Sequence, residues 1–100
     1  MTRTVRLRAE AETDLAEAAV WYENRRPRLG QDFLNEISAG LSIISERPFI
    51  YPEILRDTRR ALIRRFPFGI YYRIENDEIV VIAVLHASRS PRRWKERSGQ

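Results

Sequence analysis

The sequence contains no cysteine, which excludes disulfide bonds, thiolate metal sites and a cysteine nucleophile. It also has no run of about 18 apolar residues and no apolar segment near Met1, so we expect neither a membrane span nor a signal peptide. The absence of cysteine is compatible with a reducing compartment, and we expect a cytoplasmic protein.

Several catalytic motifs are missing as well. The chain has no phosphate-binding glycine loop, no serine-centred nucleophile motif and no metal-ligand spacing. Its clustered acids, Glu75, Asp77 and Glu78, lie at a predicted turn, where solvation is their expected role. We therefore expect no cofactor and no metal, and the sequence disfavours a conventional small-molecule enzyme.

The apolar content is sufficient for a single domain. The chain has 100 residues, of which 43% are hydrophobic, and these supply the core of one domain. No internal repeat is visible, so a solenoid is disfavoured. We expect one domain over residues 1–100, with a basic C-terminal tail over residues 91–100.

Basic residues are unevenly distributed along the chain. Lysine and arginine together number 18 against 14 acids, which gives a net charge of +4, and Lys95 is the only lysine. Residues 1–53 hold seven basic and nine acidic side chains, whereas residues 54–100 hold eleven and five. This asymmetry predicts an acidic or polyanionic partner for the second half, because guanidinium groups bind carboxylate and phosphate in bidentate fashion. The alternative is dispersed, solvated surface charge.

Hydrophobic periodicity predicts a strand followed by two helices in the first half. Residues 4–9 alternate between apolar and basic side chains, as in a half-buried strand. The next apolar positions have helical spacing, with acids that include Asp14 near the positive end of the helix dipole. We expect Gly30 to close the turn between the helices and Pro48 to follow the second helix. The apolar positions are Ala11, Leu15, Ala18, Ala19 and Tyr22 in the first helix and Phe33, Leu34, Ile37, Leu41 and Ile44 in the second.

The second half is predicted to form a sheet. Its last strand is a near-continuous apolar run, which is typical of a strand covered on both faces. Asn76 and Asp77 form the expected hairpin turn before it. The predicted fold is α+β with the order β-α-α-β-β-β, a helical hairpin packed on one face of a mainly antiparallel sheet. The expected segments are an ordered loop over residues 48–57, strands over residues 59–66, 68–75 and 78–87, and a short helix or extended tail over residues 91–97.

The predicted turn also pairs side chains across the sheet. Counting back from it puts Tyr71 opposite Ile82 and Gly69 opposite Val84. A preceding turn centred on a proline puts Arg65 opposite Gly69 as well. These pairings gather one set of basic residues at one end of the sheet: Arg64, Arg65, His86 and Arg89.

This basic cluster has two interpretations. In the functional one it is an anion site, in which the arginines hold phosphate or carboxylate and His86 shuttles a proton near neutral pH. In the structural one His86 ends a strand and bonds to a loop, while the arginines are solvated. The positive charge continues into the tail through Arg92, Arg93, Lys95 and Arg97.

The aromatic residues of the second half also have two interpretations. Tyr71, Tyr72, Phe66 and Phe68 are placed to stack on nucleobases, but aromatics that alternate along a strand are more often core residues. Trp94, which is flanked by basic residues, either stacks on a ligand or pins the tail to the body of the domain.

Five segments carry a family resemblance: AETDLAEAAVWYE, GQDFLNEI, RPFIYP, RRFPFGIYYRIE and VLHASRSPRRW. Together they resemble the RelE/ParE superfamily of type II toxin–antitoxin toxins, and the ParE branch more closely. The resemblance runs from about Val5 to Arg97, in the order of the predicted elements. It implies a bacterial or archaeal toxin neutralised by an antitoxin encoded beside it. In such a complex the C-terminal segment of the antitoxin, often disordered when free, folds over the toxin.

The superfamily implies two activities. RelE-like members cut mRNA on the ribosome, using basic side chains to hold phosphate and, in several members, a histidine or a C-terminal tyrosine for acid–base work. ParE-like members instead inhibit DNA gyrase and are not enzymes. This chain has no tyrosine after Tyr72 and lacks the RelE lysine pair, so ParE-like inhibition is favoured. If the protein is a nuclease, the matching residues are Arg64, Arg65, His86 and Arg89.

The resemblance thus implies a toxin in a hetero-oligomer with its antitoxin. The target that the resemblance implies is DNA gyrase, with the ribosome and mRNA as the alternative. A third interpretation is an inactive member that serves only as a binding partner or regulator in its operon. No residue is assigned to antitoxin binding. The residues that we expect to bind the target are Arg65, His86, Arg89, Arg92, Arg93 and Trp94.

Overall fold

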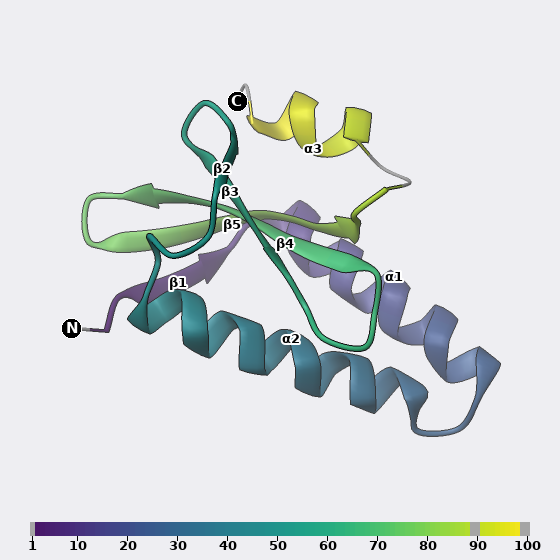
Figure 1. Cartoon of the computed structure of the whole chain (residues 1–100). Helices are drawn as coiled ribbons and strands as arrows, with labels where there is room; N and C mark the ends of the chain where they lie inside the picture. Colours follow the sequence, from purple (N-terminus) through teal and green to yellow (C-terminus); the bar gives the residue numbers. More distant parts are fainter. Residues whose placement is uncertain (1, 89–90, 99–100) are drawn as a thin grey trace.

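A five-stranded mixed sheet forms the middle layer of the domain (Figure 1). The computed structural model describes residues 2–88 and 91–98. None of the described helices is long and apolar enough to cross a membrane. The helices are α1 (Ala9–Arg25), α2 (Leu29–Glu46) and α3 (Pro91–Ser98), and the strands are β1 (Thr4–Leu7), β2 (Glu53–Leu55), β3 (Thr58–Leu62), β4 (Phe68–Glu75) and β5 (Glu78–His86).

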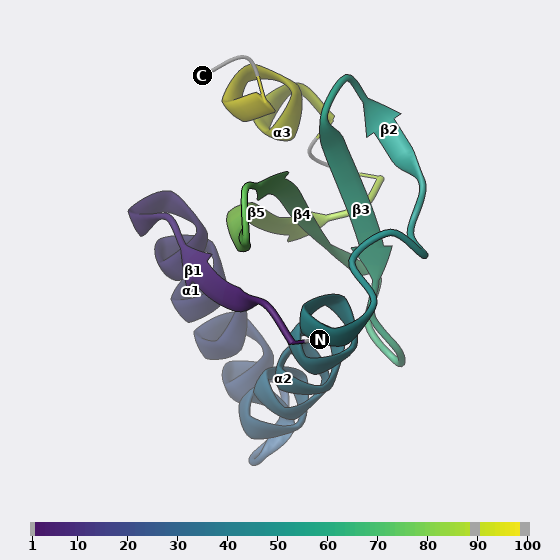
Figure 2. The ribbon, with the colours of Figure 1, turned by 90° about the vertical axis from the view of Figure 1, so that its left-hand side faces the viewer.

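The strands lie in the order β1-β5-β4-β3-β2. β1 runs parallel to β5, and the other neighbouring strands are antiparallel. The α1–α2 hairpin covers one face of the sheet and α3 lies over the other, as Figure 2 shows from the side. The predicted α+β fold, with a helical hairpin on one face of a mainly antiparallel sheet, is therefore confirmed.

The apolar run of β5 is buried on both faces, as predicted. Every residue from Ile79 to Leu85 is at most 4% exposed. The strand contributes to two apolar clusters because its side chains point to both faces of the sheet. The cluster beneath the hairpin includes Ile79, Val81 and Val84, and the cluster beneath α3 includes Val80, Ile82 and Trp94.

The connection between α1 and α2 differs from the prediction. α2 begins at Leu29, so Gly30 lies inside the helix, and the left-handed residue of the turn is Arg28 (φ 75°). The carboxylate of Glu23 stabilises this turn by accepting the backbone N–H groups of Arg28 (2.9 Å) and Gly30 (3.0 Å). A Cβ on Gly30 would lie 2.5 Å from the backbone oxygen of Ala19. Glycine is therefore required here by the close approach of two helices, not by the turn.

The predicted register of the β4–β5 hairpin holds near its turn and is wrong beyond it. The pairs next to Asn76 and Asp77 confirm that turn. Away from the turn, the register shifts by one residue between Tyr72 and Tyr71, so the partners of residues 68–71 lie one residue further along β5 than predicted. An extra residue on β5 produces this shift, a β-bulge that alternation of side chains does not reveal. The shifted pairs include Tyr71 with Ala83 and Gly69 with Leu85.

The structure contains one strand that was not predicted, and another strand ends earlier than predicted. The expected loop over residues 48–57 contains β2, a short strand that pairs with β3 at the edge of the sheet. β3 ends at Leu62, which lies opposite Gly69, so Arg65 belongs to the following loop and not to the strand. Arg65 has a left-handed backbone (φ 71°), a conformation that interrupts strand geometry.

We predict that Gly30→Ala lowers the free energy of unfolding by about 1–3 kcal/mol, because the new methyl group must displace the Ala19 carbonyl or separate the helices. Gly40→Ala is the matched control, since a Cβ there meets only the side chains of Ile63 and Ile70. Denaturant unfolding followed by circular dichroism measures both. Equal free energies of unfolding for Gly30→Ala and Gly40→Ala would refute the close approach of Gly30 to the Ala19 carbonyl.

Tyr72 provides a prediction about alkaline unfolding. Its buried hydroxyl donates a 2.7 Å hydrogen bond to the Pro48 carbonyl, and burial raises the pKa of Tyr72 to about 12. The folded state holds the proton more tightly than the unfolded chain, so this contribution to stability is complete below about pH 10 and is lost between about pH 10 and 12. Tyr72→Phe should flatten the decline in unfolding free energy over that range. Tyr71, whose pKa burial also raises, accounts for the decline that remains, and an unaltered decline would disprove the assignment.

Candidate functional site

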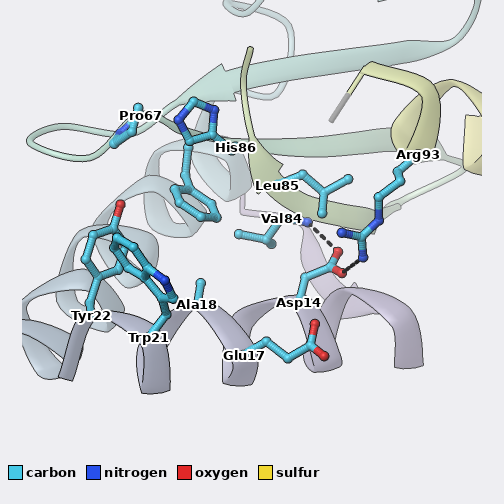
Figure 3. Close-up of a pocket in the computed structure, with 11 residues that line it drawn as sticks. Asp14, Glu17, Ala18, Trp21, Tyr22, Pro67, Val84, Leu85, His86 and Arg93 are labelled. Atoms are coloured by element: carbon cyan, nitrogen blue, oxygen red, sulfur yellow. Dashed lines mark hydrogen bonds and ion pairs between the residues drawn. The ribbon is translucent and has the colours of Figure 1, made fainter. Parts of the chain in front are cut away.

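A groove of about 430 Å³ lies between α1 and the C-terminal end of β5 (Figure 3). Residues 14–22 of α1 form one wall, and residues 84–86 of β5 form the opposite wall. Pro67, Phe68 and Arg93 complete the lining, most of which is apolar or aromatic. We call this feature the α1–β5 groove.

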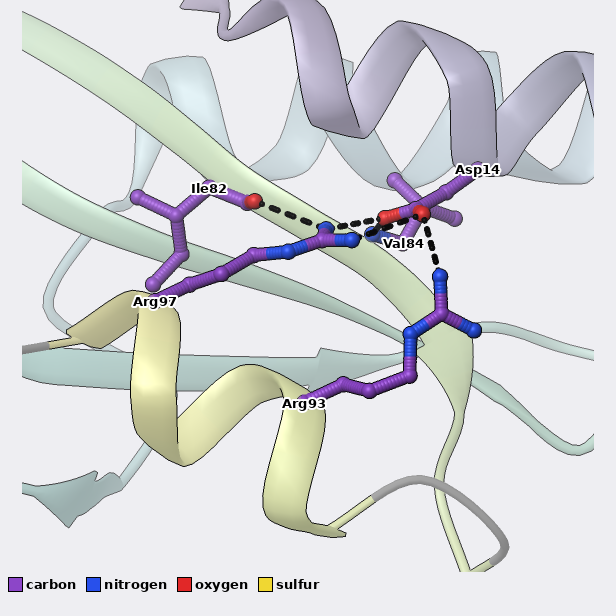
Figure 4. Close-up of polar contacts among 5 residues, drawn as sticks. All are labelled: Asp14, Ile82, Val84, Arg93 and Arg97. Carbon is purple, nitrogen blue, oxygen red and sulfur yellow. Dashed lines mark hydrogen bonds and ion pairs between the residues drawn. The ribbon is translucent and has the colours of Figure 1, made fainter.

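The buried carboxylate of Asp14 lies at one end of the groove (Figure 3), and its polar contacts are drawn in Figure 4. Asp14 is 4% exposed and accepts the backbone N–H of Val84 at 3.0 Å. Its oxygens also accept two hydrogen bonds from Arg97, one of them 3.1 Å long, and one from Arg93 at 3.3 Å. Arg97 donates a further bond to the Ile82 carbonyl at 3.2 Å. These contacts, which we call the Asp14 clamp, pair a buried charge and join α1, β5 and α3.

The sequence predicted only a helix-dipole role for Asp14, and it did not predict these tertiary contacts. A signal for the clamp is present in the sequence, since Asp14 lies three residues after Ala11 and four before Ala18. That spacing puts it on the apolar stripe of the helix, where an acid needs a buried partner. Its partners could not be found by spacing, because Arg93 and Arg97 come from the far end of the chain.

His86 lines the groove at the end of β5. Its ring contacts that of Phe68, with centroids 5.8 Å apart, and its Nδ1 accepts the backbone N–H of Ser88 at 3.2 Å. This contact matches the structural interpretation, in which the histidine ends a strand and bonds to the loop that follows. No group of His, Asp and Glu side chains in the described part of the chain is arranged to hold a metal ion.

The predicted basic cluster is brought together only in part. Arg64 and Arg65 lie in the loop between β3 and β4, which adjoins the end of β5 through a backbone hydrogen bond. The guanidinium of Arg65 contacts Asp32 of α2 at 3.4 Å, whereas His86 contacts the loop after β5. Arg89 lies outside the described residues. Arg65 and His86 therefore lie at the same end of the sheet, but Arg65 contacts α2 whereas His86 contacts the loop after β5.

Trp94 anchors α3 to the sheet. It is 6% exposed and stacks on Tyr71, with ring centroids 5.2 Å apart and an interplanar angle of 16°. Ser98 adds a polar contact, because its hydroxyl donates to the Trp94 carbonyl and accepts from the Thr58 hydroxyl. Trp94 therefore pins the tail, as the second interpretation of this residue has it, while Arg92 stays exposed.

Nucleobase stacking is excluded for most of the aromatic residues considered for it. Tyr71 and Tyr72 are both 0% exposed, and Phe66 is 8% exposed in the core beneath the hairpin. Phe68 is half-buried and lines the groove. Tyr71, Tyr72 and Phe66 pack in the interior because the sheet has cover on both faces, which leaves these three rings no open surface.

The chain is similar to known toxins in sequence and in fold. A family model described as "ParE toxin of type II toxin-antitoxin system, parDE" matches residues 5–91. A solved structure of the chromosomal ParDE toxin–antitoxin system from P. aeruginosa superposes with a TM-score of 0.77 and 15% identity, over 87% of this chain and 98% of that chain. A chain of the toxin–antitoxin complex RelBE2 from Mycobacterium tuberculosis has a TM-score of 0.58 and 26% identity, over 86% and 99% of the two chains. No curated protein sequence matches the chain.

We predict that Asp14→Ala lowers the free energy of unfolding by about 3–5 kcal/mol, because Arg97 and the Val84 N–H lose their buried acceptor. Arg93→Ala should cost less than about 1 kcal/mol, since that side chain is 53% exposed and Arg97 still neutralises the carboxylate. Urea unfolding measures both variants. Similar losses in the two would show that the clamp is not centred on Asp14 and Arg97.

Proposed function

The chain belongs to the ParE toxin family of type II toxin–antitoxin systems, and we propose that it acts by inhibiting DNA gyrase. The family match over residues 5–91 is the observation that carries this proposal, because gyrase is the target that ParE-like members share. A cognate antitoxin neutralises the toxin. The two solved structures described above are toxin–antitoxin systems, which supports such a partner.

The contacts of the site favour binding over cleavage. Two of the residues that a nuclease would use are already engaged, since His86 accepts a backbone N–H and Arg65 pairs with Asp32. Asp14, a carboxylate of the groove, is bound by two arginines. Guanidinium groups are poor proton donors and acceptors near neutral pH because their pKa exceeds about 12. A binding surface requires no proton transfer, so these contacts support an inhibitor that is not an enzyme.

Exposed arginines of α3 form the proposed contact with gyrase. Arg92 is exposed, and the side chain of Arg93 is 53% exposed although it contacts Asp14. Trp94 contributes by holding α3 in position, since its ring is buried. Arginine suits such a contact because its planar guanidinium binds carboxylate and phosphate groups in bidentate fashion.

We expect the purified protein to trap gyrase on DNA. Cleavage complexes should accumulate when it is added to gyrase, ATP and plasmid DNA, and prior addition of the antitoxin should prevent this. The assay measures the linear DNA that is released after denaturation of gyrase. Absence of any effect at stoichiometric excess would rule out gyrase as the target.

A pair of charge reversals tests the proposed contact in the same assay. Arg92→Glu should weaken gyrase inhibition at least about tenfold, because it reverses a charge on the binding surface. Arg56→Glu is the matched control, since Arg56 is also exposed but lies in the turn between β2 and β3. Equal effects of the two reversals would indicate that only net charge matters.

A RelE-like mRNA endoribonuclease is the second candidate. It is favoured by the position of His86, which lines an open groove close to the loop that carries Arg64 and Arg65. Under this alternative the protein cleaves mRNA in the ribosomal A site, and the double variant Arg65→Ala/His86→Ala loses cleavage. Toxicity that survives in the double variant would exclude the nuclease.

A further inference from the structure

Exposed arginines from two connections of the chain lie at one end of the domain. The turn between α1 and α2 and the loop between β3 and β4 are both directed toward this end (Figure 1). Residues 23–32 and 64–67 together hold five arginines and two acids, which gives a net charge of +3. We call the five exposed side chains the arginine tip: Arg25, Arg26, Arg28, Arg64 and Arg65.

The ring of Phe66 holds the two connections together. It is 8% exposed and makes edge contacts with the rings of Tyr22 at 4.8 Å and Phe33 at 5.4 Å. Tyr22 lies in the last turn of α1, and Phe33 lies near the start of α2. This packing keeps the loop that carries Arg64 and Arg65 against the end of the helical hairpin.

The local structure does not favour arginine at two of these positions. Arg28 (φ 75°) and Arg65 (φ 71°) have a left-handed backbone, which glycine adopts at lower cost. Arg28 also caps the N-terminus of α2, where the helix dipole disfavours a cation. Residues in such conformations cluster at functional sites, where the side chain offsets the cost. We therefore infer that the guanidinium groups, and not the turns, are the reason for arginine here.

The guanidinium groups of the tip keep donors available and are held apart from one another. Both acids of this end are engaged, because Glu23 accepts backbone N–H groups of the turn and Asp32 contacts Arg65 at 3.4 Å. The side chain of Arg65 is 52% exposed, and one such contact leaves most of its five N–H donors available. Arg25 is held over the ring of Trp21, 4.2 Å from its centroid. Charges fixed at separate places suit successive phosphates of a polymer better than one small anion.

We propose that the arginine tip binds the phosphate backbone of duplex DNA. A duplex presents closely spaced phosphates, which guanidinium groups bind in bidentate fashion without reading the sequence. None of the five arginines lines the α1–β5 groove, so this contact is separate from that site. The choice of DNA over RNA rests on the proposed function, because gyrase acts on DNA. The phosphate chemistry depends only on the tip.

The first test measures DNA binding without gyrase. The probe is a fluorescently labelled duplex of about 20 base pairs, and fluorescence anisotropy measures its dissociation constant with the full chain. The dissociation constant should be roughly micromolar at about 50 mM salt. The logarithm of the binding constant should fall with the logarithm of the salt concentration with a slope of about −3 to −4.5, as expected for four or five phosphate contacts.

The second test removes two arginines while it relieves the backbone at both. Arg28→Gly/Arg65→Gly should weaken DNA binding at least about tenfold and reduce the salt slope by about 1.8. Its melting temperature should not fall, because glycine suits both left-handed positions. Arg26→Gln, which leaves the backbone of both turns unchanged, should weaken binding about three- to eightfold and provides the same test without a glycine.

The matched control is Arg47→Gly/Arg56→Gly, which removes the same charge elsewhere. Both arginines are exposed, Arg47 at the far end of α2 and Arg56 in the turn between β2 and β3. The control should weaken DNA binding less than about threefold, because it changes net charge without removing a phosphate contact of the tip.

Each outcome separates the tip from the gyrase proposal. Loss of DNA binding in the tip variants, with the control unchanged, supports the tip even if the parent protein fails to inhibit gyrase. Equal losses in the tip and control variants would show that only net charge matters. Unchanged binding in the tip variants would place DNA on another basic face, such as α3, and tighter binding of duplex RNA of the same sequence would assign the tip to RNA. Each of these three results, or no DNA binding by the parent chain, overturns the inference and leaves gyrase inhibition untouched.

Discussion

The buried carboxylate of Asp14 holds together three elements that belong to different layers of the domain. β1 pairs with β5 only as far as Val81, so the backbone of β5 beyond that residue needs other partners. Asp14 accepts the Val84 N–H and Arg97 donates to the Ile82 carbonyl, so side chains take over where the neighbouring strand ends. The same contacts seat α3 on the sheet and lie at one end of the α1–β5 groove.

Several arginines of the second half contact other parts of the chain, so fewer of them are available to bind a polyanion than the composition indicates. Arg59 donates to the Tyr51 carbonyl at 2.6 Å, Arg73 donates to the Ser98 carbonyl, and Arg97 belongs to the Asp14 clamp. These arginines stabilise the fold, so a smaller number of arginines remains available to bind partners.

Features that depend on local pattern could be predicted from the sequence, whereas those set by tertiary contacts could not. Periodicity predicts both helices of the hairpin and strand β5, and the resemblance predicts the family. The bulge of β5 opposite Tyr71 and Tyr72 is a property of the pairing of two strands, and the left-handed Arg28 is stabilised by the carboxylate of Glu23. In the candidate site, the arginines are visible in the sequence, but the clamp joins residues 83 positions apart and the groove beside Trp21 forms only in the folded chain.

A double-mutant cycle between Asp14 and Arg97 tests the clamp most directly. Asp14→Ala, Arg97→Ala and the double variant are unfolded in urea, and the coupling energy is the difference between the loss in the double variant and the sum of the single losses. A partly buried, bidentate contact of this kind predicts a coupling of about 2 kcal/mol or more. A coupling within about 0.5 kcal/mol of zero would show that the two residues act independently and that the clamp does not hold α1, β5 and α3 together.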